Sequence, residues 1–178
     1  DVGCGGGIIC EPLARLGAKV TGIDFAPNNI NAAKIHSKKN KLKINYIHKD
    51  VEKSKLNGKF DLILMFEVLE HLDDWKKTIK KIKKNLNKNG LIIISTINRN
   101  TLSKLFAISI AENILKWIPK GTHDYNKLIK PEELKKTLTQ ENLHFKNIKG
   151  LVFNPLNGEW KLSKNYMINY FCTANFIN

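Results

Sequence analysis

The chain has 178 residues, of which 42% are hydrophobic, which is enough for one domain with a core. No run reaches the ~18 apolar residues of a membrane-spanning helix. The net charge of +14 comes almost wholly from scattered lysines, because Arg15 and Arg99 are the only arginines. Arginine is the usual reader of phosphate and guanine, so we expect no nucleic-acid partner.

The three cysteines include no CxxC pair, which argues against a disulfide framework or a zinc knuckle. The chain also begins inside a motif, at Asp1 and without an initiator methionine. We therefore expect residues 1–178 to form a single, N-terminally incomplete domain, with its first strand and upstream helices missing.

The first hundred residues alternate expected helices with expected strands. The helices are predicted over 8–16, 27–40 and 74–87, and the strands over 19–24, 45–50, 60–66 and 91–97, with a turn at Asn89-Gly90. Short connections and near-continuous apolar strands are typical of parallel sheets. The pattern predicts an α/β fold, a Rossmann-like doubly wound and mostly parallel sheet.

The second half departs from this alternation. Helices are predicted over 101–120 and 131–142, and strands over 144–155 and 166–174. We expect the two strands to form an antiparallel C-terminal hairpin at the edge of the sheet. Residues 101–130 are then an inserted helix and loop, which is a candidate lid or membrane contact.

A glycine-rich turn opens the chain, with Gly3, Gly5 and Gly7 at alternate positions in DVGCGGG. The spacing is not the dinucleotide GxGxxG, because Ile8 stands where the third glycine would fall, and no GK[ST] phosphate loop is present. Such a turn between a strand and a helix lets a ligand approach the backbone.

Aspartates end the next two expected strands. Asp24 is placed to accept the ribose hydroxyls of a nucleoside, and Asp50 is placed to face an adenine amino group. With the glycine turn they predict a nucleoside crevice at the carboxyl edge of the sheet. The alternative is a purely structural turn beside a surface aspartate.

This arrangement resembles the class I S-adenosylmethionine-dependent methyltransferases, whose glycine motif looks like DVGCGGG and whose ribose-binding acid falls where Asp24 stands. The resemblance implies S-adenosylmethionine as the methyl donor, with its methionine part against the turn at Gly3 and Gly5.

Glu67, Glu70 and His71 follow the fourth expected strand at i, i+3 and i+4 spacing, which places them on one side of a helical turn. Two carboxylates and an imidazole can hold a divalent cation, which would bind both oxygens of a catechol. The spacing by itself favours a metal-free alternative, in which these residues cap a helix or shape the cofactor pocket. His71 could then act directly as a general base.

A more specific resemblance lies in the second half. The segments STINRN (95–100), 103–134, GLVFNPLNGEWKL (150–162) and 165–171 are similar to the ubiquinone-biosynthesis O-methyltransferase family. The resemblance implies methylation of catechol hydroxyls on polyprenylated rings, or of demethylubiquinol. It also implies cofactor contacts at Gly3, Asp24 and Phe66, and a divalent cation, expected to be Mg²⁺, at Glu67, Glu70 and His71.

The expected helix over 102–118 carries one polar stripe and a broad apolar surface, with Trp117 near its end. Such a helix can lie in a membrane interface, where a polyprenyl substrate resides, or pack over the site as a lid. We therefore expect peripheral membrane association, at the inner face of a bacterial membrane or the matrix side of a mitochondrial one. A quinone-biosynthesis complex is a further candidate partner.

The lysine run 76–88 is expected to be a solvated face over buried Ile79, Ile82 and Leu86. Two rival functions remain open at this point. One is methylation of RNA or protein, suggested by the charge, and the other is a non-catalytic lipid- or partner-binding module.

Overall fold

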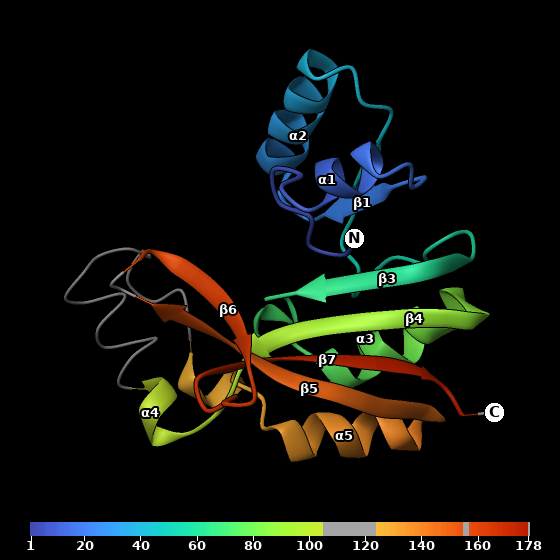
Figure 1. Ribbon diagram of the computed structural model, residues 1–178. Coiled ribbons are helices and arrows are strands. Elements are labelled where there is room, and N and C mark those ends of the chain that lie inside the picture. Colours follow the sequence, from blue (N-terminus) through green and yellow to red (C-terminus); the bar gives the residue numbers. More distant parts are fainter. Residues whose placement is uncertain (105–123, 155–156, 178) are drawn as a thin grey trace.

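The computed structural model describes residues 1–104, 124–154 and 157–177 (Figure 1). Its first elements follow the predicted alternation closely. They are α1 (Cys10–Arg15), β1 (Thr21–Asp24), α2 (Pro27–Lys39), β2 (Asn45–His48) and β3 (Phe60–Phe66). Pro27 occupies the first turn of α2, where its missing N–H costs no helical hydrogen bond.

The predicted helix over 74–87 is shorter than expected. It forms α3 (Trp75–Ile82) and the 3-10 turn η2 (Lys83–Asn85), and β4 (Leu86–Ile97) follows directly. The prediction of a turn at Asn89-Gly90 is therefore wrong, because both residues lie within β4. The β3–β4 register passes from Phe60↔Leu86 to Leu62↔Leu91, so a bulge in β4 accommodates the extra residues.

Three strands form in the second half, where two were predicted. The described elements are α4 (Thr101–Ser103), η4 (Tyr125–Lys127), α5 (Pro131–Gln140), β5 (Leu143–Asn154), β6 (Glu159–Ser163) and β7 (Asn169–Phe176). Most of the predicted helix over 101–120 lies outside the described residues. Within the described residues, no helix has the length and apolar character to cross a bilayer.

The edge hairpin consists of β5 and β6, not of the two strands predicted for it. β7 instead lies between β4 and β5, in the order β3-β4-β7-β5-β6. The sequence pattern missed β6 because Glu159–Ser163 is exposed along nearly its whole length and has no alternation of buried and exposed positions.

The first three residues, Asp1–Gly3, join the β1–β2 pair to this larger sheet. Val2 bridges Ile23 of β1 and Met65 of β3, both in parallel sense. β1 pairs in parallel with β2, and β3 with β4, whereas β7 runs antiparallel to β4 and to β5. The predicted α/β fold with a mostly parallel sheet is confirmed, and strands β1 to β5 share one direction.

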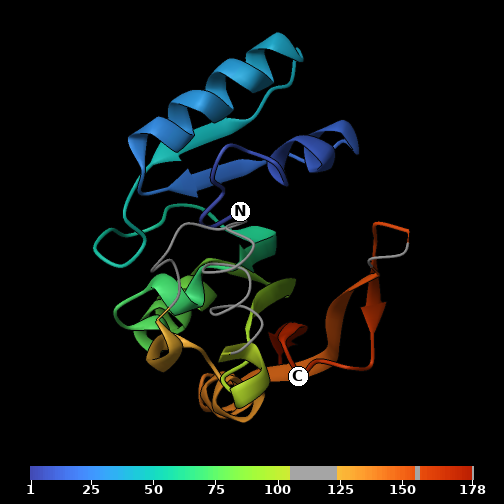
Figure 2. The same cartoon turned by 90° about the vertical axis from the view of Figure 1, so that its left-hand side faces the viewer.

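The main core lies between the sheet and helices α3 and α5. Ile79, Ile82 and Leu86 are buried as predicted, together with Leu134 and Leu138 of α5. A smaller cluster fixes α1 and α2 against β2 and includes Cys10, Ile30, Ala33 and Tyr46. Figure 2 shows α2 lying along the β1–β2 pair, while the β5–β6 hairpin stands away from the body.

The lysine run is only partly a solvated face. Lys76, Lys77 and Lys80 are exposed as expected. Lys81 donates from Nζ to the carbonyls of Val51 and Glu52, at 2.7 and 3.0 Å. Lys83 pairs with Glu141 at 2.6 Å. Two of these lysines therefore tie α3 and η2 to neighbouring segments, which the periodicity of the run did not indicate.

Packing explains two of the three alternating glycines. A β-carbon at Gly3 would collide with a methyl group of Val68, and one at Gly7 would collide with the Tyr46 hydroxyl. All three glycines have positive φ, +71° at Gly3, +51° at Gly5 and +86° at Gly7, so the backbone conformation does not distinguish them. Gly5 differs, because no atom lies within 4 Å of the place its β-carbon would occupy. Open space for a ligand thus adjoins Gly5, whereas protein side chains exclude larger residues at Gly3 and Gly7.

We expect Gly7→Ala to lower the free energy of unfolding by about 2 kcal/mol or more, because the new methyl group meets a buried tyrosine at an unfavourable φ. Gly6→Ala is the matched control, since residue 6 has open space and no positive φ. It should change stability by less than about 0.5 kcal/mol. Urea denaturation measures both, and equal effects of the two substitutions would contradict this account.

Candidate functional site

A cavity of about 310 Å³ lies where β1, β2 and β3 end. One wall comes from the glycine turn and the residues after β1, another from the residues after β2, and a third from the turn after β3. The lining residues are Val2, Gly3, Ile23, Asp24, Phe25, Lys49, Asp50, Val51, Glu52, Glu67, Val68, His71 and Leu72. A larger, more open hollow of about 760 Å³ lies at the opposite ends of β1 and β2 and contains none of the predicted site residues.

Asp24 organises one side of this cavity. Its Oδ2 accepts from the backbone N–H of Gly5 at 2.9 Å, and its Oδ1 accepts from Ala26 N–H at 2.8 Å and from the Asn29 amide at 3.3 Å. The side chain is thus buried between the glycine turn and the start of α2. A carboxylate offers about four lone-pair positions, so acceptor capacity remains on Oδ2 for a ligand hydroxyl.

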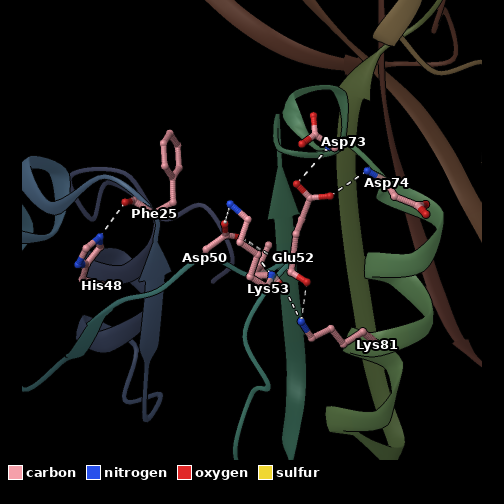
Figure 3. Close-up of polar contacts among 9 residues, drawn as sticks. Phe25, His48, Asp50, Glu52, Lys53, Asp73, Asp74 and Lys81 are labelled. Atoms are coloured by element: carbon pink, nitrogen blue, oxygen red, sulfur yellow. Dashed lines mark hydrogen bonds and ion pairs between the residues drawn. The ribbon is translucent and has the colours of Figure 1, made fainter.

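The loop after β2 is fixed by its own polar groups (Figure 3). Asp50 accepts from the N–H groups of Glu52 and Lys53 at 2.8 and 3.3 Å, and these hydrogen bonds, the former above all, lower the pKa of Asp50. His48 donates from Nε2 to the carbonyl of Phe25 at 2.8 Å. The predicted adenine-facing aspartate therefore lies on the cavity wall in an ordered turn.

Glu52 joins this loop to the far wall. Its carboxylate accepts from the backbone N–H groups of Asp73 and Asp74, at 3.1 and 2.8 Å (Figure 3). Asp74 is the N-cap of α3 and accepts from Lys77 N–H. Glu52 thus ties the loop after β2 to the start of α3, and Lys81 ties it to the last turn of the same helix. The two walls cannot separate without breaking charge-assisted hydrogen bonds.

Glu67 directly follows β3 with φ +52°, a conformation that is uncommon for a residue with a side chain. Ser95 of β4 supports it, because the Ser95 hydroxyl donates to Glu67 Oε1 at 2.7 Å while Glu67 N–H donates to the Ser95 carbonyl at 3.1 Å. A strained backbone that neighbouring groups hold in place is often found at functional sites.

Glu70 lies in the turn η1 (Leu69–His71) and is 3% exposed. Thr96 donates to its Oε2 at 2.9 Å, while Oε1 has no hydrogen-bond partner among the described residues. Burial, followed by the negative charge of nearby Glu67, raises the pKa of Glu70 to about 8. Glu70 is therefore protonated at neutral pH unless a positive charge reaches it.

The predicted trio of metal ligands is only partly brought together. Glu67 and His71 line the cavity, whereas Glu70 points into the core toward Thr96. Across the part of the chain that the structure describes, no three His, Cys, Asp or Glu side chains form a group able to hold a metal. The reason is local, since residues 69–71 form a single 3-10 turn rather than the α-helical turn that the spacing assumed.

Phe66 and Gly5 are absent from the cavity lining, and their predicted cofactor contacts stay predictions. The Phe66 ring packs edge-on against Phe171 of β7, with ring centroids 5.5 Å apart, and does not line the cavity. Gly5 adjoins the site through its N–H bond to Asp24 rather than through the cavity lining.

The sequence reasoning missed Phe25, Glu52, Ser95 and Thr96. Phe25 lines the cavity with a side chain that is 75% exposed, and its position directly after Asp24 was an available signal. Ser95 and Thr96 lie near the end of a strand that was predicted, so their place at the same sheet edge could also have been expected. Glu52 had no signal of this kind, because its role depends on a contact with α3 about twenty residues away.

The domain class follows from the sheet order, the glycine turn and Asp24 at the end of β1. A model of the methyltransferase domain matches residues 1–147. An S-adenosylmethionine-dependent methyltransferase from Clostridium acetobutylicum shares the fold, with a TM-score of 0.76 and 14% identity over 100% of this chain and 83% of that one. The magnesium protoporphyrin IX methyltransferase of Synechocystis, solved with bound SAH, has a TM-score of 0.70 and 18% identity, over 98% of this chain and 71% of that one. The chain is a methyltransferase domain with the fold of the class I S-adenosylmethionine-dependent methyltransferases.

Curated relatives define the family within this class. The ubiquinone biosynthesis O-methyltransferase of Rickettsia typhi is 46% identical over 171 residues, which are 96% of this chain and 70% of that protein. The enzyme of the same name from Pelagibacter ubique is 48% identical over 170 residues, 96% of this chain and 71% of that one. The chain belongs to the ubiquinone biosynthesis O-methyltransferase family, as the resemblance implied.

We expect Asp24→Ala to weaken binding of S-adenosylmethionine by about tenfold to a hundredfold, because a charge-assisted hydrogen bond to the ribose is lost and the turn loses its acceptor. Asn29→Ala is the matched control, since it removes one donor to Asp24 and leaves the carboxylate in place. Isothermal titration measures the affinity. Unchanged affinity in a folded Asp24→Ala variant would refute the assignment.

Glu70 makes stability depend on pH. Its folded pKa of about 8 lies above the ordinary 4.5, so between these values the folded state holds a proton that the unfolded state releases. The contribution of Glu70 to stability is then largest at low pH and falls as pH rises through this window. In metal-free buffer, the unfolding free energy of the wild type relative to Glu70→Gln should fall by up to about 1.4 kcal/mol per pH unit.

Urea denaturation at a series of pH values measures this difference. Glu132→Gln, which removes an exposed carboxylate of α5, is the control for loss of an acidic residue. Parallel curves for wild type and Glu70→Gln throughout the window would show that Glu70 is not held protonated in the folded protein.

Proposed function

We propose that the protein transfers the methyl group of S-adenosylmethionine to a phenolic oxygen of a polyprenylated catechol, or of demethylubiquinol, in ubiquinone biosynthesis. The observation that carries the proposal is one cavity that joins the buried Asp24 to Glu67 and His71. The names of relatives at 46% and 48% identity supply the substrate class.

The residues around the cavity divide the work between cofactor and substrate. Asp24 and the open space beside Gly5 fit the ribose and the methionine part of the donor. When bound, S-adenosylmethionine supplies a methyl group on a positively charged sulfur. The phenolic oxygen forms the new bond to the methyl carbon as the carbon–sulfur bond breaks, and the phenolic proton leaves to a base.

His71 is the candidate for that base. It lines the cavity on the wall that continues from β3, opposite the loop after β2. An imidazole has an ordinary pKa close to neutral and can accept a proton from a phenol within reach. Most of the rate acceleration is expected from holding the oxygen in line with the methyl group.

We also propose that a divalent cation, Mg²⁺, assists at Glu67 and Glu70, which requires the Glu70 carboxyl group to turn from Thr96 toward the cavity. The support is the nearness of the two carboxyl groups, inferred from the effect of Glu67 on the pKa of Glu70, and the unpartnered Oε1 of Glu70. Mg²⁺ characteristically keeps several waters and binds one or two carboxylates together with its substrate. Such a cation would hold both catechol oxygens and lower the pKa of the hydroxyl. His71 is not grouped with these carboxylates, so its role as a third ligand stays a prediction.

Peripheral membrane association belongs to the same proposal. A polyprenylated ring resides in a bilayer, and the helix predicted over 102–118 is the candidate contact, although it lies mostly outside the described residues. We propose the cytoplasmic face of the inner membrane in a bacterium, or the matrix side in a mitochondrion. Assembly with other enzymes of quinone biosynthesis is a further expectation.

The test is methyl transfer from labelled S-adenosylmethionine to a short-tailed polyprenyl catechol by the full-length protein, with Mg²⁺ or with chelator. We expect transfer in Mg²⁺ and at least about a tenfold loss in chelator, because the hydroxyl then ionises less readily. His71→Gln should lower kcat, and Glu132→Gln is the control for a change of a polar residue outside the cavity.

Each outcome decides one part of the proposal. Transfer that is indifferent to chelator would remove the cation and leave the base role with His71. Absence of transfer while the donor still binds would contradict the catechol substrate and favour RNA or protein acceptors. Absence of donor binding would favour a non-catalytic module.

A further inference from the structure

The β5–β6 hairpin has one apolar face. The antiparallel register pairs Phe153 with Trp160 and Leu151 with Leu162. Directly opposed residues of two strands lie on the same side, as do alternate residues along one strand. Leu151, Phe153, Trp160 and Leu162 therefore share one side, which we call the hairpin face.

The hairpin face is open to solvent. Leu162 is 68% exposed, Trp160 58% and Phe153 36%. The rings of Phe153 and Trp160 pack against each other, with their centroids 5.0 Å apart. None of these side chains belongs to the two buried clusters of the core. The segment that follows adds further exposed apolar side chains, namely Tyr166, Met167 and Ile168. Contiguous apolar exposure of this kind marks an interaction surface.

The base of the hairpin is held firmly against the body. A β-carbon at Gly150 would collide with the carbonyl of Asn165, so the chain after β6 crosses directly over β5 at this point. Asn169 accepts from the N–H of Leu151 at 2.8 Å. The hairpin therefore presents its face in a defined direction, standing clear of the body in Figure 2.

The hairpin leaves the body at the same edge of the sheet as the cavity. β5 is antiparallel to β7, which is antiparallel to β4, so β5 runs in the same direction as β3 and β4. The end of β5 that continues into the hairpin thus projects from the same edge of the sheet as the end of β3, as the ribbon in Figure 1 shows, and Glu67 and His71 follow β3.

The charges around the hairpin face indicate what covers it. Lys149, Lys161 and Lys164 are exposed on or beside the hairpin, and Glu159 is paired with Lys161 at 3.2 Å. Interfaces between proteins are depleted in lysine, whereas lysine beside tryptophan is typical of segments that lie at the headgroup level of a bilayer. The net charge of +14 adds attraction to an anionic surface.

We propose that the hairpin face docks on a bilayer that contains anionic lipid, with Trp160 and Leu162 inserted at the headgroup boundary. This contact is separate from the helix predicted over 102–118. It holds the carboxyl edge of the sheet toward the membrane, so a prenylated ring can reach the cavity without leaving the bilayer. The proposal rests on the proposed function for the meaning of this orientation.

The experiment is flotation of the full-length protein with vesicles of phosphatidylcholine containing phosphatidylglycerol, and with phosphatidylcholine alone. The variant Trp160→Ser with Leu162→Ser should lower partition into the anionic vesicles by about tenfold or more. Val152→Ser, which alters an exposed residue on the opposite side of the hairpin, should leave partition unchanged. Methyl transfer to a soluble short-tailed catechol should be the same in all three proteins.

Two failures remain distinguishable. Vesicle binding that the double variant retains would overturn the hairpin proposal while leaving the enzyme intact. If the wild-type protein transfers no methyl group to the soluble catechol, that result would instead contradict the proposed function. If light scattering shows that the double variant loses an oligomer and keeps its vesicle binding, the face is an interface between copies and the proposal is overturned.

A second measurement applies if the double variant loses its circular dichroism signal. In a background of Trp75→Phe and Trp117→Phe, brominated lipids should quench the fluorescence of Trp160 in an otherwise unaltered hairpin. Absence of quenching in anionic vesicles would overturn the proposal.

Discussion

The short stretch Asp1–Gly3 is the constraint on which the site depends. Ile23 N–H donates to the Asp1 carbonyl at 2.9 Å, Val2 N–H donates to the Leu64 carbonyl at 2.9 Å, and Gly3 N–H donates to the Ile23 carbonyl at 2.7 Å. These bonds hold β1 and β3 on either side of Val2. Because all three segments run in parallel, their carboxyl ends meet, and Asp24 at the end of β1 lines the same cavity as Glu67 and His71 in the turn after β3.

The polar side chains of the site are largely engaged in holding the backbone in place. Asp24 fixes the glycine turn, Glu52 fixes the start of α3, and Ser95 fixes the strained Glu67. Charge-assisted bonds of this kind preorganise a site, so little reordering is needed when a ligand binds. Glu70 is the exception, because its buried Oε1 has no partner among the described residues. The site thus contains one buried carboxyl oxygen without a partner, next to the proposed cation.

The two halves of the sheet carry different parts of the function. Strands β1 to β3 and their loops form the cavity proposed for the cofactor, within a fold shared with methyltransferase structures at 14% to 18% identity. The antiparallel strands β5, β6 and β7 extend the sheet on the other side and project an apolar hairpin from the same edge. The similarity to the curated ubiquinone enzymes spans 96% of the chain and therefore includes both halves.

The sequence by itself determined the α/β class, most element positions, and the placement of Asp24, Asp50, Glu67 and His71 at one edge. These follow from local periodicity and from the rule that parallel strands end together. Tertiary structure alone decided that β7 enters between β4 and β5, that Glu70 turns into the core, and that Glu52 bridges two walls. Each of these depends on pairing between segments far apart in the chain, and one-dimensional spacing contains no information about which distant partner a strand or carboxylate will meet.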